Sequence, residues 1–200
     1  GSVVPHDLPN NMLFTKREPL GVVALITPWN FPIALPAWKL APALVSGNTV
    51  VLKPASQAPA MALELARAFD EAGLPAGVLN VVVGRGKEVG DELANHATEQ
   101  ALSFTGSHGV GHGIYQQLAP RMTRAQMEMG GKNPTIVLAD ADLDFAAKIV
   151  GLAGFGQTGQ VCTATSRVIV NEKVADEFTE KLVEQAKARN VGNGMADGVT

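Results

Sequence analysis

The chain has 200 residues, of which 46% are hydrophobic and 18% are charged, and its formal net charge is −3. This composition is typical of a folded globular protein and excludes an intrinsically disordered chain. The basic side chains form no cluster that would grip a nucleic-acid backbone. No apolar run approaches the roughly 20 residues that a membrane span needs, and no signal peptide stands at the start. We therefore expect a cytoplasmic protein that binds neither nucleic acid nor membrane.

From Gly21 onward, short β-rich runs alternate with longer amphipathic stretches, which is typical of a parallel sheet with crossover helices. The pattern predicts strands over 21–27, 48–54, 78–84 and 101–106, and helices over 33–47, 58–73, 87–96 and 108–119. Four successive β-α units favour an α/β fold with a doubly wound, Rossmann-like parallel sheet. Such sheets bind ligands beyond the carboxyl ends of their strands, so we expect the site in the loops there.

A second segment begins after Pro120. The sequence predicts two strand-like runs around the glycine-rich turn of TRAQMEMGGKNPTIVL, and then a helix over 142–155, a strand over 167–171 and a helix over about 175–189. We place the domain boundary in Met129–Lys132. The chain is thereby divided into a first domain, residues 1–130, and the beginning of an α/β second domain, residues 131–200.

The only cysteine, Cys162, lies in GFGQTGQVCTATS, among glycines, glutamines and hydroxyl side chains. A nucleophilic cysteine needs partial exposure and surroundings that favour the thiolate, and backbone N–H groups can supply them. Composition alone favours a buried, inert thiol, since free cysteines are among the most buried residues. A single cysteine forms no internal disulfide, and His108 and His112, set among glycines, are interpreted as surface side chains, so we expect no metal site.

Two further side chains are candidates for catalysis, each with a plain structural alternative. Glu128 stands between Met127 and Met129 in QMEMGGKNP. Apolar neighbours would desolvate its carboxylate and make it a better base, although a solvent-facing strand glutamate fits the pattern equally well. Asn30 stands in ITPWNFP at the end of the first predicted strand, where its amide is suited to donate to an oxyanion or simply to cap a turn.

Three loops are candidates for binding phosphate or sugar. GRGKEVG, residues 84–90, follows a strand, but valine replaces the third glycine of the dinucleotide fingerprint. FTGSHGVG places Gly106 and Ser107 at a helix N-terminus, which favours a pyrophosphate but equally fits a plain N-cap. Lys53 ends the second predicted strand, where it is positioned for sugar hydroxyls or phosphate, or is simply solvated.

Five motifs, read together and in their order along the chain, resemble the aldehyde dehydrogenase superfamily: TPWNFP, KPAS, FTGS, MEMGGKNP and GQVC. The resemblance extends from about Lys16 to Thr200. The resemblance implies that Cys162 attacks an aldehyde carbonyl, that the Asn30 amide and the Cys162 backbone N–H hold the oxyanion, and that Glu128 is the general base for thioester hydrolysis. The alternatives are a CoA-acylating relative, which generally lacks the glutamate, and a non-catalytic derivative, which would be expected to have lost one of the three residues.

The same resemblance implies NAD(P) as cofactor. The implied contacts are Ile26, Thr27, Pro28, Trp29, Lys53, Ser56, Gly86, Gly106, Ser107, Met129 and Gly130. Many NAD-preferring relatives have at position 56 a glutamate, which would repel a 2′-phosphate, so Ser56 favours NADP over NAD. Most relatives have an asparagine where this chain has Gln157. In this respect the chain resembles the semialdehyde branch of the superfamily, which includes 2-oxoglutarate semialdehyde and succinate-semialdehyde dehydrogenases.

Family members are much longer than this chain, which starts at Gly1 without methionine and ends in a glycine-rich stretch. We therefore expect a piece of a longer enzyme, comprising most of the NAD(P)-binding domain and the start of the catalytic domain. The resemblance implies a homo-oligomer for the intact enzyme. We expect the 200 residues alone to be inactive and poorly stable, because sheet edges and half of a catalytic domain would be left uncovered.

Overall fold

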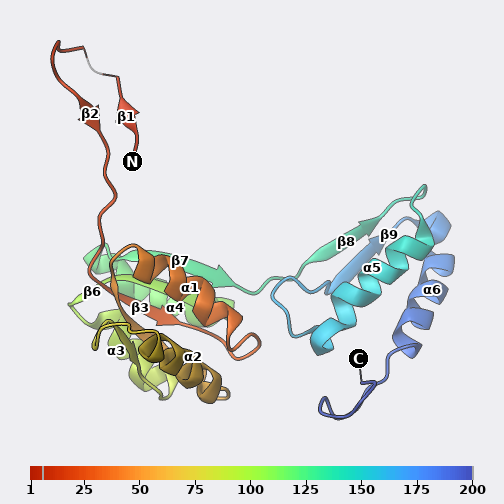
Figure 1. The fold of residues 1–200 in the computed structure, drawn as a ribbon. Coiled ribbons are helices and arrows are strands. Elements are labelled where there is room, and N and C mark those ends of the chain that lie inside the picture. Colours follow the sequence, from red (N-terminus) through yellow and green to blue (C-terminus); the bar gives the residue numbers. More distant parts are fainter. Residues whose placement is uncertain (6, 200) are drawn as a thin grey trace. The chain divides into compact units, whose positions relative to one another are not determined.

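A computed structural model describes residues 1–5 and 7–199 (Figure 1). His6 and Thr200, the last residue of the predicted second domain, lie outside the described residues. The chain forms two compact units, Gly1–Glu128 and Met129–Thr200. Of the helices that the structure describes, none is long and apolar enough to cross a membrane.

A five-stranded sheet with the order β5-β4-β3-β6-β7 is the centre of the first unit. Its strands are β3 (Val22–Ile26), β4 (Thr49–Lys53), β5 (Leu79–Val81), β6 (Glu99–Gly106) and β7 (Arg124–Met129). β3 pairs in parallel with both β4 and β6, and β4 pairs in parallel with β5. The chain thus builds one side of β3 first and then continues on the other side, so the predicted doubly wound α/β fold is confirmed.

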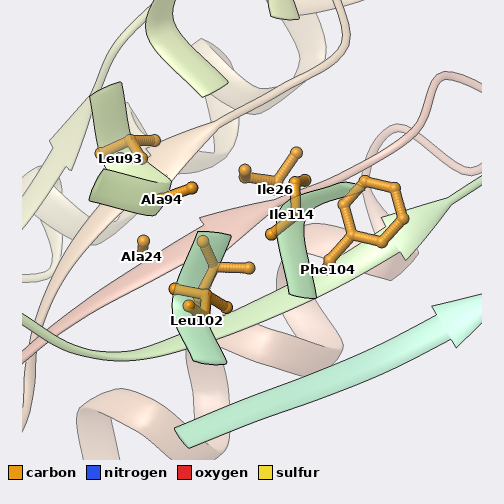
Figure 2. Packing of buried hydrophobic residues seen from close by; sticks show 8 residues of the cluster. Ala24, Ile26, Leu93, Ala94, Leu102, Phe104 and Ile114 are labelled. Atoms are coloured by element: carbon orange, nitrogen blue, oxygen red, sulfur yellow. The ribbon is translucent and has the colours of Figure 1, made fainter. Parts of the chain in front are cut away.

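Helices cover both faces of this sheet (Figure 1). They are α1 (Ala34–Val45), α2 (Pro59–Glu71), α3 (Asp91–Asn95) and α4 (His108–Leu118), with a 3-10 turn, η2 (Ala119–Arg121), after α4. Side chains alternate along β3, since Val23 and Leu25 pack with Leu40 of α1, whereas Ala24 and Ile26 pack with the α3 and α4 side. Figure 2 shows this second cluster, which includes Leu93, Ala94, Leu102, Phe104 and Ile114.

Two predicted elements differ from the structure, each for a local reason. The strand predicted over 78–84 is only Leu79–Val81, because its partner β4 ends at Lys53 and the following Pro54 has no N–H to continue the ladder. The helix predicted over 87–96 is divided into a π-helical turn, η1 (Gly86–Gly90), and the short helix α3. Glycines at both ends of η1 lower its α-helical propensity.

A small antiparallel pair precedes the sheet in a region for which the sequence pattern predicts no element. β1 (Val3–Val4) pairs with β2 (Leu13–Phe14), and both strands are exposed. Two-residue strands without a buried face carry no periodicity signal, so they could not be found from the hydrophobic pattern.

The second unit contains a parallel pair of strands and two long helices. Its elements are β8 (Pro134–Val137), α5 (Leu143–Phe155), β9 (Arg167–Val170), α6 (Ala175–Lys187) and two 3-10 turns, η3 (Gly156–Gly159) and η4 (Glu172–Val174). Its core is formed by Val137, Ala147, Val150 and Phe178.

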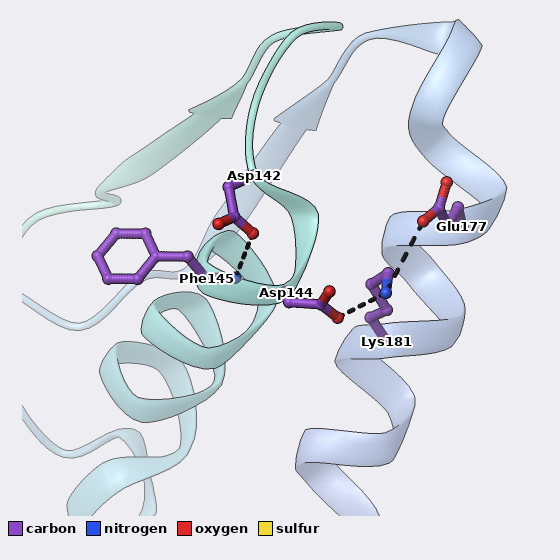
Figure 3. A network of polar contacts seen from close by, with 5 residues as sticks. All are labelled: Asp142, Asp144, Phe145, Glu177 and Lys181. Atoms are coloured by element: carbon purple, nitrogen blue, oxygen red, sulfur yellow. Dashed lines mark hydrogen bonds and ion pairs between the residues drawn. The ribbon is translucent and has the colours of Figure 1, made fainter.

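Polar contacts fix the start of α5 and its contact with α6 (Figure 3). The Asp142 carboxylate accepts a 3.0 Å hydrogen bond from the Phe145 N–H, which caps α5. Lys181 of α6 donates to Asp144 at 2.5 Å and lies 3.7 Å from Glu177. The hydrogen bond to Asp144 raises the pKa of Lys181 above its usual range, so the ammonium form is favoured.

The buried Glu99 at the start of β6 gives a prediction about stability. It is 5% exposed, and its Oε2 has no hydrogen-bond partner among the described residues. Burial raises the pKa of Glu99 above 4.5, and His96 and Arg121 oppose part of the rise. Between pH 4.5 and this raised pKa, the folded state therefore holds a proton that the unfolded chain loses, so the carboxyl destabilises the fold increasingly over that range and by a constant amount above it.

We expect Glu99→Gln to raise the unfolding midpoint of the intact protein by a few degrees near neutral pH, and by much less below pH 4.5. Thermal unfolding followed by circular dichroism over this pH range measures the difference. Glu92→Gln on the exposed face of α3 is the control and should change little. A wild-type protein more stable than Glu99→Gln near neutral pH would contradict the prediction.

Candidate functional site

A cavity of about 340 Å³ lies in the first unit, and it is within the size range of small-molecule sites. Its lining residues are Ile26, Lys53, Gly86, Lys87, Gly90, Asp91, Gly109, Val110, Gly113, Ile114 and Gln117. Ile26 and Lys53 end the parallel strands β3 and β4. The cavity therefore borders the carboxyl edge of the sheet, near the β3/β6 position where the strand order reverses and where doubly wound folds bind ligands.

Glycines make up much of the cavity wall. A Cβ placed on Gly86, Gly90, Gly109 or Gly113 would meet no described atom within 4 Å. Gly90 is nevertheless buried, so its backbone borders the cavity directly. Glycine allows close approach of a ligand to the backbone, so these four positions leave room at the cavity wall for a cofactor such as a dinucleotide.

Lys53 and Ser56 come from the segment that follows β4. Lys53 is 5% exposed and its Nζ donates to the carbonyl of Pro54 at 3.0 Å. Burial lowers the pKa of Lys53 from its usual range. One of its three N–H donors is used in this bond. Ser56 is exposed, and its hydroxyl donates to the carbonyl of Gly84 at 2.9 Å, which ties the segment after β4 to the loop after β5.

The ends of β3 and β6 carry the other candidate cofactor residues of the first unit. Thr27 is buried and its N–H donates to the Lys53 carbonyl at 3.1 Å. The hydroxyls of Thr27 and Thr105 are buried without a hydrogen-bond partner among the described residues. Ser107 stands at the N-cap of α4, and its side chain makes no capping bond within the described part of the chain. Two buried hydroxyls near this strand edge thus lack a hydrogen-bond partner within the described part of the chain.

Hydrogen bonds connect Glu128 to a buried lysine through two neutral side chains of the first unit. Lys39 donates to Ser103 Oγ at 2.6 Å, Ser103 donates to Gln126 Oε1 at 2.5 Å, and Gln126 Nε2 donates to Glu128 Oε1 at 3.3 Å. Burial lowers the pKa of Lys39, and the Glu128 charge opposes that shift. Glu128 itself is exposed, as in the solvent-facing alternative that its strand pattern allows.

Cys162 is a free thiol and is exposed, which contradicts the buried alternative that composition favoured. It lies in the second unit, in the loop between η3 and β9. The Asn133 side-chain amide donates to the carbonyls of Cys162 at 2.8 Å and of Ala164 at 3.2 Å. The Ala164 N–H closes a turn onto the Val161 carbonyl at 3.0 Å. The thiol is therefore presented on a loop with a defined backbone path.

The approach to Cys162 contains an unfavourable backbone conformation. Gln157 and Thr158 have φ values of 52° and 56°, and Gly159 follows with φ 72°. The left-handed region disfavours side chains with a Cβ by roughly 1 to 2 kcal/mol per residue, and a β-branched threonine is rare there. Gln157 also borders a cavity of about 290 Å³ together with Val161 and Thr163.

The structure groups the predicted site residues within each unit. In the first unit, Ile26, Lys53 and Gly86 line one cavity. Half-buried Asn30 and Pro28 and exposed Trp29 follow β3, and half-buried Gly106 ends β6. The second unit holds Cys162 with exposed Met129 and Gly130. Whether Asn30 and Glu128 approach Cys162 stays a prediction. No group of three or more His, Cys, Asp or Glu suited to a metal occurs in the described ranges.

Several cavity residues were missed by sequence reasoning, in particular Gly109 and Gly113 of α4. Their i,i+4 spacing places them on one helix face, and this spacing was the available signal. The helix predicted over 108–119 is present as α4, and the imidazole rings of His108 and His112 stack on it with centroids 6.1 Å apart. The buried Lys39 was also missed, since only the tertiary structure brings it to Ser103.

The strand order and the glycine-lined cavity at the carboxyl edge place the first unit in the Rossmann-like class. The model of the aldehyde dehydrogenase family matches residues 1–200. The chain belongs to the aldehyde dehydrogenase family.

Individual relatives agree with this assignment. The chain is 58% identical over 186 residues to the alpha-ketoglutarate semialdehyde dehydrogenase of Haloferax volcanii, covering 93% of this chain and 39% of that protein. It is 52% identical to the 2,5-dioxopentanoate dehydrogenase of Saccharolobus solfataricus, covering 98% and 42%. A crystal structure of betaine aldehyde dehydrogenase from Staphylococcus aureus with NAD+ matches with a TM-score of 0.95 at 36% identity, covering 100% and 39%. The chain thus spans about two fifths of the length of these relatives.

Proposed function

We propose that the intact protein oxidises an aldehyde to the carboxylic acid with NAD(P)+ through a covalent intermediate on Cys162. The observation that carries this proposal is the exposed, free thiol of Cys162 on a hydrogen-bonded loop, in a chain of the aldehyde dehydrogenase family. We assign residues 1–130 to an NAD(P)-binding domain and residues 131–200 to the start of the catalytic domain. We further propose a cytoplasmic homo-oligomer.

The chemistry assigns one role to each of three side chains. The Cys162 thiolate adds to the aldehyde carbonyl and forms a thiohemiacetal, whose oxyanion is held by the Asn30 amide and the Cys162 backbone N–H. Bound NAD(P)+ supplies the acceptor for the hydride, whose departure from the former carbonyl carbon leaves a thioester on Cys162. Glu128 accepts a proton from water, which attacks the thioester, releases the acid and restores the thiol.

The substrate that we propose is a semialdehyde, an aldehyde with a carboxylate at its far end. The names of the Haloferax and Saccharolobus relatives both describe the semialdehyde of 2-oxoglutarate, and identity to these proteins exceeds half of the aligned positions. Gln157 beside the cysteine loop supports the same branch. We therefore expect 2-oxoglutarate semialdehyde to be oxidised with a higher kcat/KM than an uncharged aldehyde of similar length.

For the cofactor, we propose that the first unit's cavity and the strand ends beside it receive NAD(P). Lys53 and Ser56 would hold the adenosine ribose, Gly86 would border the cavity, and Gly106 with Ser107 would meet the pyrophosphate. Residues 26–29 would line the β3 end, and Met129 with Gly130 would lie near the nicotinamide. Lys53 keeps donors for a 2′-phosphate, and Ser56 brings no negative charge, which supports a preference for NADP.

Replacing the proposed nucleophile should abolish oxidation and leave cofactor binding intact. We expect Cys162→Ser to lower kcat by at least about 1000-fold, because the alkoxide that would be needed forms far less readily than a thiolate. The affinity for NAD(P), measured by fluorescence titration, should stay within about twofold, since the proposed cavity is formed by the first unit alone.

Thr163→Ala, beside Cys162, is the control and should keep most of its activity. Full activity of Cys162→Ser would contradict the proposed mechanism. Acyl-CoA formation that is faster than acid formation in the wild type would support the CoA-acylating alternative. Absence of turnover with any semialdehyde or aldehyde would support the non-catalytic one.

The cofactor preference should depend on position 56. We expect the wild-type protein to have a higher kcat/KM with NADP than with NAD. A carboxylate in Ser56→Glu should lower kcat/KM for NADP by roughly 10- to 100-fold through repulsion of the 2′-phosphate, with a much smaller effect for NAD. Ser46→Glu is the matched control, because Ser46 is also exposed and also donates to a backbone carbonyl. A strong NAD preference of the wild type would refute the NADP assignment.

Filling the cavity should block the cofactor without unfolding the protein. A side chain at Gly113 would extend into space that is open among the described atoms, so we expect Gly113→Leu to fold and to weaken NAD(P) binding at least tenfold. Fluorescence titration measures the affinity, and circular dichroism measures the fold. Gln116→Leu on the exposed face of α4 is the control. Unchanged affinity in folded Gly113→Leu would exclude this cavity as the cofactor site.

A further inference from the structure

We propose that Asn133 is a positioning residue, whose side-chain amide holds the Cys162 loop in the conformation that reacts. This inference rests on the proposed function, since it gives the Cys162 thiol a chemical role. Asn133 lies in GGKNP, a motif whose asparagine has no part in the cysteine chemistry described above.

The backbone places Asn133 beside the loop. Pro134 follows it and restricts Asn133 to extended backbone. Pro134 pairs with Arg167 in the parallel β8–β9 ladder, so Asn133 comes to lie beside Ser166, only four residues after Cys162. The Ser166 N–H donates to the Asn133 carbonyl at 3.0 Å. The sheet register thus brings this side chain next to the loop.

The amide of Asn133 makes two bonds that only a double donor can make. Its Nδ2 donates to the carbonyls of Cys162 at 2.8 Å and of Ala164 at 3.2 Å. Both partners are acceptors, so the nitrogen of the amide, and not its oxygen, must face them. An aspartate of the same shape has no donor and would place negative charge against two carbonyl oxygens.

The loop needs such support because its own backbone is unfavourable. Gln157 and Thr158 are left-handed, which disfavours this path by an amount comparable to one or two hydrogen bonds. Other described bonds of this segment include the Ala164 to Val161 turn and a 3.3 Å bond from the Thr165 N–H to the Ala153 carbonyl, but these do not hold the Cys162 carbonyl. The two Asn133 bonds hold the carbonyls of Cys162 and Ala164, on either side of Thr163, and so fix the peptide that follows Cys162.

For a reaction that needs the thiolate and the Cys162 N–H aimed at the same carbonyl, a displacement of about 1 Å lowers the rate by on the order of 100-fold. Loss of both Asn133 donors should therefore act on the chemical step. It should not act on cofactor affinity, because the proposed cofactor cavity is lined by residues of the first unit.

The test compares Asn133→Asp, Asn133→Ala and a matched control in the intact protein. Asn171→Asp is the control, since the Asn171 side chain accepts a 3.0 Å bond from the Lys173 N–H and a carboxylate keeps that bond. Three quantities are measured: kcat per folded enzyme with a semialdehyde, NAD(P) affinity, and the rate of Cys162 alkylation by iodoacetamide, followed on the Cys162 peptide by mass spectrometry.

We expect both Asn133 variants to lower kcat by about 10- to 100-fold and to change the alkylation rate at least threefold, with NAD(P) affinity within twofold of wild type. Asn171→Asp should match the wild type. Asn133→Ala adds no charge, so it keeps the test valid if Asn133→Asp does not fold. Wild-type kcat and alkylation in a folded Asn133 variant would overturn the proposal. An activity loss that only follows the folded fraction, or an equal loss in Asn171→Asp, would also overturn it.

A different result would mark failure of the proposed function. If the wild-type protein oxidises no aldehyde, the enzyme assignment fails, but the alkylation rates still test whether Asn133 controls the Cys162 loop. Equal alkylation rates in the wild type and both variants would then refute the role of Asn133 independently.

Discussion

The central strand β3 imposes the main constraint on the first unit, because its side chains are buried on both faces. Val23 and Leu25 belong to one core cluster, and Ala24 and Ile26 belong to the other. A strand of this kind needs helices on both sides of the sheet, and right-handed crossovers supply them only if the chain reverses its direction of growth at the centre. The reversal separates the loops after β3 and β6, and that separation makes the carboxyl edge a ligand site.

Glycine serves this edge in two different ways. The absence of a side chain leaves room at the cavity at four positions, Gly86, Gly90, Gly109 and Gly113. At Gly106, by contrast, a Cβ would come within 2.5 Å of the Phe104 ring, so close packing at the end of β6 requires glycine there. The cavity glycines lower helix propensity in α4 by roughly 1 kcal/mol each. The buried contacts of Ile114 and Leu118 offset that loss and keep the helix continuous.

The sequence pattern predicted the parts of the fold that depend on periodicity. The buried strands β3, β4 and β6 and the helices α1, α2, α4, α5 and α6 all have a long apolar repeat, and the structure contains them. The pattern did not predict features that depend on strand pairing, such as the early end of β5. It also missed strands without a buried face, namely β1 and β2. For the site, motifs identified Ile26, Lys53 and Gly86, but Lys39 and Gly113 depend on contacts between distant segments. The hydrogen bonds of the Asn133 side chain, across 29 and 31 residues, have no local signal either.

Each unit contributes its own part of the proposed site: the first contains the glycine-lined cavity, Asn30 and Glu128, and the second contains Cys162. Residues of the first unit line the cavity proposed for the cofactor, and the Asn133 hydrogen bonds to the thiol loop lie within the second unit. The second unit therefore orients its cysteine by its own parallel strand pair: Pro134 opposite Arg167 sets the register, the register places Asn133, and Asn133 holds Cys162. The exposed thiol follows a left-handed stretch at residues 157–159, and in our proposal it obtains its direction from the two side-chain donor bonds of Asn133, whose backbone Pro134 restricts.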